Sequence, residues 1–121
     1  MMVRIRGKVF SGKGEGKHYL KKSEYREFFS ELLGGSVYPG TLNLRLAQKW
    51  GELKNWSSYK PKSYGKIFYK LGKLHQRDLS IPIVLVRPVL TDYEEKIIEV
   101  VARQHLKKEL NLHDGDVVTI E

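Results

Sequence analysis

Apolar and polar residues alternate along two stretches of the chain, which is the pattern of a strand with one buried face. The first stretch predicts a strand over Val3–Phe10. The second predicts a strand over Thr41–Leu46, directly after a turn at Pro39-Gly40. Its three leucines share one face, which predicts a side against a core. Thr41 and Asn43 share the other face, about 6.6 Å apart along the strand.

The stretch 23–33 has a helical period instead, because its apolar residues recur at every third or fourth position. These residues are Tyr25, Phe28, Phe29, Leu32 and Leu33. Ser23 stands where an N-terminal cap is expected, and Gly34-Gly35 stands where the helix should end. We interpret this helix as one that packs on the core and not as a cofactor site.

The second half of the chain is rich in β-branched residues and predicts mainly strands. We expect a short strand over Lys66–Tyr69, a turn at Gly72 and a central strand over Leu79–Val86. A tight turn at Asp114-Gly115 leads into a last strand over Val117–Ile120. The chain therefore fits a mainly β fold.

Two segments allow more than one interpretation. Lys96–Ala102 fits one face of a helix that continues to Leu110, whereas its β-branched density favours a strand followed by a short helix over Gln104–Leu110. The stretch Ala47–Lys62 shows no period. Its three aromatic residues are Trp50, Trp56 and Tyr59. Such residues most often pin a loop to the body of a domain, and stacking on a bound ring system is the alternative.

Composition and charge narrow the class of protein. The 121 residues suffice for one domain with one core. The absence of cysteine excludes disulfides and thiolate metal sites and fits a cytoplasmic protein. The formal net charge of +8 attracts polyanions, which are nucleic acid, an anionic membrane or a nucleoside triphosphate. Charge alone favours nucleic acid, but the basic residues are scattered and form no long basic arm.

A glycine-rich and lysine-rich stretch, Gly12-Lys13-Gly14-Glu15-Gly16-Lys17, follows the first predicted strand. Its glycines let backbone N–H groups turn toward an anion, and its lysines add positive charge. It is not a Walker A loop, because Ser11 and His18 stand where that pattern needs Gly and Ser or Thr. It is not a dinucleotide fingerprint either, because Lys17 replaces the third glycine. The stretch can therefore be interpreted either as a phosphate-binding loop or as a flexible hairpin.

Thr41 and Asn43 together offer one hydroxyl and one amide carbonyl on the same side of a strand. Neither group is charged. Such a pair suits Mg²⁺ whose remaining ligands are water and phosphate oxygens. An ordinary amphipathic strand is the alternative interpretation.

These segments together resemble the archaeal CTP-dependent riboflavin kinases. The matching segments are Gly7–Gly16, Tyr38–Leu44 and Leu110–Val118, and the match is weakest over Ala47–Leu79. The resemblance implies a mainly β fold, a closed six-stranded cradle-loop barrel with short flanking helices, as one domain over residues 1–121. It also favours the strand interpretation of Lys96–Ala102.

The activity that the resemblance implies is transfer of the γ-phosphoryl group of CTP to the ribityl 5′-hydroxyl of riboflavin, giving FMN and CDP. Gly12–Lys17 would hold the triphosphate, and Gln104-His105-Leu106-Lys107 would meet the base and sugar. Thr41 and Asn43 would hold Mg²⁺. The flavin-side contacts of the family fall on Thr91 and Glu99.

Glu99 is the candidate catalytic base, and Glu15 is the competing candidate. A solvent-facing polar residue between Ile98 and Val100 is the alternative interpretation of Glu99. If a flavin binds, Trp50, Trp56 and Tyr59 are the aromatic residues available to stack on its ring.

A basic DNA-binding barrel is the alternative function, since related cradle-loop barrels include DNA-binding regulators. A glycine loop combined with two uncharged oxygen ligands favours the enzyme, because a DNA-binding protein has no need of both. We therefore expect a cytoplasmic, monomeric enzyme whose partners are riboflavin and CTP, with no nucleic acid and no membrane.

Replacing Gly14 by valine tests whether Gly12–Lys17 binds phosphate. The branched Cβ should obstruct the approach of backbone N–H groups to an anion. We expect the affinity for CDP, measured by calorimetric titration, to fall steeply, while riboflavin binding, followed by flavin fluorescence, changes little. Thermal melts of both ligand-free proteins control for folding. Unaltered CDP affinity in a well-folded Gly14→Val protein would contradict the interpretation as a phosphate-binding loop.

Overall fold

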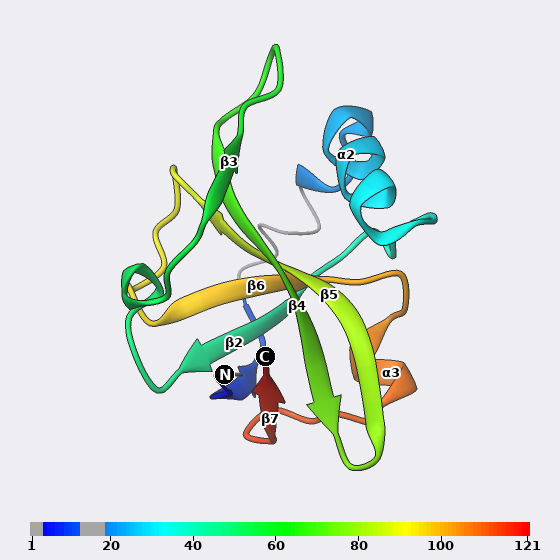
Figure 1. The fold of residues 1–121 in the computed structure, drawn as a ribbon, viewed down its shortest axis with the longest axis vertical. Coiled ribbons are helices and arrows are strands. Elements are labelled where there is room, and N and C mark those ends of the chain that lie inside the picture. Colours follow the sequence, from blue (N-terminus) through cyan, green and yellow to red (C-terminus); the bar gives the residue numbers. More distant parts are fainter. Residues whose placement is uncertain (1–3, 13–18) are drawn as a thin grey trace.

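The computed structural model describes residues 4–12 and 19–121. Within these ranges the strands form one antiparallel sheet that closes into a barrel (Figure 1). The strands are β1 (Ile5–Phe10), β2 (Leu42–Leu46), β3 (Ser57–Tyr59), β4 (Ile67–Gln76), β5 (Leu79–Pro88), β6 (Ile97–Val101) and β7 (Val117–Ile120). The helices are α2 (Ser23–Leu33), α3 (Leu106–Glu109) and the 3₁₀ turn η1 (Trp50–Glu52).

The closed ring follows the order β4-β5-β6-β2-β1-β7, and β7 pairs again with β4. The strand β3 lies outside this ring, on the edge of β4. The ends of the described chain meet beside β7, where Ile5 is opposite Ile120 and Arg4 Nε lies 3.1 Å from Glu121 Oε2 (Figure 1). The predicted closed six-stranded barrel is confirmed.

The side-chain alternation of the strands creates two hydrophobic clusters. Residues such as Leu44, Ile83 and Ile98 face the inside of the barrel, where all three are fully or almost fully buried. The second cluster lies on the outer face of β5 and β6, where Phe29 of α2 packs with Val84, Val86 and Val101. Because α2 covers this outer face, β6 is buried on both sides. No helix in the described part of the chain is long and apolar enough to span a membrane.

Most of the predicted elements are confirmed, but the start of α2 is not as expected. The N-cap residue is Lys22, which has no capping side chain, and Ser23 is the first residue of the helix. Gly34 does end the helix, in the left-handed conformation at φ 72°. The strand interpretation of Lys96–Ala102 is also confirmed, as β6.

The predicted turn at Gly72 is wrong, and so is the end of the predicted strand Lys66–Tyr69. Gly72 lies inside β4, which continues to Gln76, and the chain turns at Arg77-Asp78 instead. A Cβ on Gly72 would lie 2.7 Å from the backbone oxygen of Glu121. The glycine is therefore required by the close approach of the chain beyond β7, where Lys73 and Glu121 exchange backbone hydrogen bonds of 2.9 Å.

Replacing Gly72 by alanine tests this closure. The added methyl group should push the two backbones apart and lower the free energy of unfolding by about 1–3 kcal/mol. Gly51→Ala is the matched control, because nothing lies within 4 Å of a Cβ at Gly51. Its effect should stay within about 0.5 kcal/mol. Urea unfolding of both variants measures the difference, and equal stabilities would contradict the tight closure.

Candidate active site

Four residues lie directly opposite one another across the outer face of the barrel. Phe10 of β1 is paired with Asn43 of β2, and Asn43 is paired with Glu99 of β6. Glu99 is in turn opposite Val86 of β5. Directly opposed residues in a sheet have Cβ atoms about 4.5–5.5 Å apart. The two polar residues are therefore neighbours in the middle of an otherwise apolar row.

Glu99 is buried, with an exposed fraction of 1%. The interpretation of Glu99 as a solvent-facing residue is therefore wrong. Its Oε2 atom accepts a hydrogen bond of 2.8 Å from the hydroxyl group of Tyr19. Burial follows from the cover over the outer face of β6, because Tyr19 and α2 belong to the same hydrophobic cluster. A buried carboxylate beside an amide is an unusual arrangement, and such arrangements are typical of active sites.

Asn43 has a buried side-chain oxygen. Among the described residues, none donates a hydrogen bond to Asn43 Oδ1. Thr41 lies two residues earlier, directly before β2, and is half-buried. An orphaned amide oxygen with a nearby hydroxyl fits a hard cation that keeps water or phosphate ligands. No group of three acidic, histidine or cysteine side chains gathers within residues 4–12 and 19–121.

Gly12 lies against this pair of strands. A Cβ built on Gly12 would overlap the hydroxyl group of Tyr93 and the amide group of Asn43. Only glycine therefore fits here without displacing Asn43. The ring of Tyr93 also meets Phe10 edge-on at 5.9 Å. The start of the predicted phosphate loop is thus in contact with the predicted metal ligand.

The connection from β5 to β6 carries Thr91 and is held by Arg87. The guanidinium group of Arg87 donates hydrogen bonds to the backbone oxygens of Tyr93, Glu94 and Ile97, at 2.9, 2.8 and 2.8 Å. Thr91 Oγ1 accepts a hydrogen bond of 3.2 Å from the backbone N–H of Tyr93. Arg87 therefore fixes the loop that brings Tyr93 to Gly12, beside Asn43, and Thr91 hydrogen-bonds within this loop.

The predicted nucleotide segment 104–107 lies across a small pocket from Thr41. The pocket is lined by Tyr38, Gly40, Thr41, Leu42, Val100, Ala102, Gln104, His105, Leu106 and Lys107. His105 stacks on Tyr38 with ring centroids 4.2 Å apart. The volume of about 30 Å³ holds a water molecule but no nucleobase. A base bound here needs the Tyr38–His105 stack to open, or lies on its outer surface.

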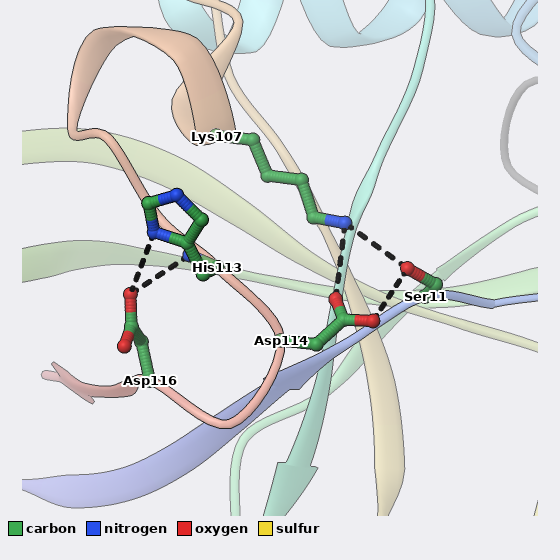
Figure 2. Close-up of polar contacts among 5 residues, drawn as sticks. All are labelled: Ser11, Lys107, His113, Asp114 and Asp116. Carbon is green, nitrogen blue, oxygen red and sulfur yellow. Dashed lines mark hydrogen bonds and ion pairs between the residues drawn. The ribbon is translucent and has the colours of Figure 1, made fainter.

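Lys107 is tied to the end of the first strand. Its Nζ lies 3.4 Å from Ser11 Oγ and 3.4 Å from Asp114 Oδ1, and Ser11 Oγ donates a 2.8 Å hydrogen bond to Asp114 Oδ2 (Figure 2). The hydrogen bond from Ser11, with a smaller contribution from Lys107, lowers the pKa of Asp114 below its ordinary value. The structure thus brings the segment 104–107 next to Ser11 and Gly12.

The rest of the predicted phosphate loop, Lys13, Gly14, Glu15, Gly16 and Lys17, lies outside the described residues. Its role and that of Glu15 as competing base stay predictions.

The aromatic residues of the segment 47–62 have contacts typical of loop anchors. Trp56 Nε1 donates a 3.1 Å hydrogen bond to the backbone oxygen of Trp50, and the ring of Trp50 stacks on Phe68 at 5.3 Å. Tyr59 stacks on Phe28 of α2 at 3.8 Å. These contacts favour the interpretation that the aromatic residues pin the loop to the barrel.

Sequence reasoning missed three residues of this site, Tyr19, Arg87 and Tyr93. None belongs to a recognisable motif, and each acts through a partner that is distant along the chain or through backbone oxygens. Only the tertiary structure reveals them.

Comparisons with known proteins find relatives that match nearly the whole chain. A family model named CTP-dep_RFKase, with the description "Domain of unknown function DUF120", matches residues 9–121. A riboflavin kinase of Archaeoglobus fulgidus is 36% identical over 130 residues, which cover 98% of this chain and 54% of that protein. A riboflavin kinase of Methanococcus aeolicus is 32% identical over 130 residues, which cover 99% of this chain and 98% of that protein.

A riboflavin kinase of Ignicoccus hospitalis is 36% identical over 125 residues, which cover 98% of this chain and 70% of that protein. The chain thus spans about half the length of the Archaeoglobus relative and nearly all of the Methanococcus one. With a family model that matches most of its length, the chain belongs to the CTP-dependent riboflavin kinase family.

Proposed function

We propose that this protein transfers the γ-phosphoryl group of CTP to the 5′-hydroxyl of riboflavin, giving FMN and CDP. The observation that carries the proposal is the opposed pair of Asn43 and Glu99, one an orphaned amide oxygen and the other a buried carboxylate. Phosphoryl transfer needs a metal ligand and a proton acceptor close together, with phosphate groups held beside them. Gly12 packs against Asn43 and starts the loop that supplies the phosphate contacts.

Each residue has a defined part in this proposal. The oxygen of the ribityl hydroxyl group attacks the γ-phosphorus while Glu99 accepts the proton of that hydroxyl group. The bond from the γ-phosphorus to the oxygen that bridges it to the β-phosphate breaks, and CDP is released. The hydroxyl group of Thr91 donates a hydrogen bond to the phosphate group of the product FMN. Lys13, Lys17 and Lys107 offset the negative charge of the phosphates.

Thr41 and Asn43 hold Mg²⁺ in this proposal. The ion neutralises charge on the phosphate oxygens when it is bound. In this proposal the segment Gln104–Lys107 meets the cytosine base and its ribose once the Tyr38–His105 stack opens, or on the outer surface of that stack. The protein acts as a monomer in the cytoplasm, on small-molecule substrates alone.

A panel of the four nucleoside triphosphates tests the donor. The purified protein is incubated with riboflavin, Mg²⁺ and each nucleotide, and FMN is measured by chromatography. We expect FMN with CTP and far less with ATP or GTP. Glu99→Gln serves as the control for contaminating kinases. Equal rates with ATP would contradict the choice of CTP, and no FMN with any nucleotide would favour the DNA-binding alternative.

Replacing Asn43 by alanine tests the metal site. We expect kcat to fall at least about tenfold and the Mg²⁺ requirement to rise, because one ligand is lost. Stability should change by less than about 1 kcal/mol, because no described group donates to Asn43 Oδ1. Steady-state kinetics over a Mg²⁺ series and urea unfolding measure both effects.

Arg45→Ala is the matched control for this variant. Arg45 follows Asn43 on the same outer face of β2 and pairs with exposed Glu94 at 2.8 Å. Its removal should leave kcat unchanged. Near-normal activity of Asn43→Ala at limiting Mg²⁺ would contradict the metal role.

A further inference from the structure

The hydrogen bond between Tyr19 and Glu99 joins two residues that are 80 positions apart in the chain. Both are buried, with exposed fractions of 9% for Tyr19 and 1% for Glu99. A phenol that donates to a carboxylate forms a charge-assisted hydrogen bond, which is stronger than a neutral one and gains further strength where water is excluded. The contact is therefore a strong constraint on the carboxyl group.

Tyr19 is itself held in place by its surroundings. Its ring meets the ring of Tyr25 edge-on at 5.5 Å, and the hydroxyl group of Tyr25 donates to the backbone oxygen of Gly65. The next residue, Leu20, is fully buried in the same cluster. This packing holds the Tyr19 hydroxyl group beside Glu99.

The strand β6 determines only where the backbone of Glu99 lies. The last torsion of a glutamate side chain has broad minima, so the backbone alone leaves the carboxyl group free to rotate. The hydrogen bond from Tyr19 orients Oε2 of this carboxyl group.

We propose that Tyr19 is a positioning residue whose hydroxyl group holds the Glu99 carboxylate in the orientation that receives the proton of the substrate hydroxyl. The inference rests on the proposed function, since it needs Glu99 to act on the acceptor. In the sequence, Tyr19 comes two residues after Lys17. The loop expected to hold the triphosphate therefore begins at Gly12 beside Asn43 and leads to Tyr19 beside Glu99.

Tyr19→Phe removes the hydroxyl group and keeps the ring that packs on Tyr25. We expect kcat with CTP and riboflavin to fall about tenfold or more, because a misplaced catalytic group reduces the rate steeply. The KM for CTP should stay within about twofold of wild type, because the ring and the chain path are kept. Tyr64→Phe is the matched control, since it removes another hydroxyl group of the same cluster. Its kcat should match that of wild type.

The double variant Tyr19→Phe/Glu99→Gln separates positioning from an independent role. If Tyr19 acts through Glu99, adding Tyr19→Phe to Glu99→Gln should lower kcat by less than about twofold further. Two outcomes would overturn the positioning role while the kinase activity stands. One is a double variant whose kcat falls by the product of the two single reductions, and the other is a wild-type kcat in Tyr19→Phe. Absence of FMN formation by the wild-type protein with every nucleotide would overturn the proposed function, and the role of Tyr19 with it.

Discussion

The register of β2 is the constraint on which the rest of the site depends. This strand pairs with β1 on one side and with β6 on the other, and both pairings place Asn43 on the outer face. A shift of one residue would move its leucines out of the barrel and Asn43 into it. The complete burial of Leu44 inside the barrel fixes the register, and the register in turn sets Asn43 opposite Glu99.

The polar residues of the site lie among apolar residues, and these surroundings determine how strongly the polar groups interact. Desolvation of a carboxylate or an amide is costly, so such groups are retained where they serve a purpose. Hydrogen bonds offset part of this cost. Glu99 accepts one from the hydroxyl group of Tyr19, and Arg87 donates to backbone oxygens of the neighbouring loop. The low dielectric around these groups would also strengthen the contacts with phosphate and metal that we propose.

Local patterns in the sequence predicted the parts of the structure that depend on local chemistry. The alternation of β2 predicted inward leucines and an outward Asn43, because the two faces of a strand are set by its own residues. The burial of Glu99 was not predictable, since Ile98-Glu99-Val100 is also the pattern of a strand exposed to solvent. The cover comes from Tyr19 and α2, far away in the chain. The position of Gly72 inside a strand was not predictable for the same reason, because the approach of Glu121 is a tertiary contact.

The central claim is that Asn43 binds a divalent cation together with a nucleotide, and Mn²⁺ tests it most directly. Mn²⁺ replaces Mg²⁺ and broadens the NMR signals of nearby protons. With CDP and Mn²⁺ present, the account predicts that the side-chain amide signals of Asn43 disappear. Those of Asn55, which lines a pocket with Ile5 and Glu121 that includes neither Asn43 nor Gly12, should stay sharp. Sharp Asn43 signals under conditions where CDP and Mn²⁺ are bound would contradict the account.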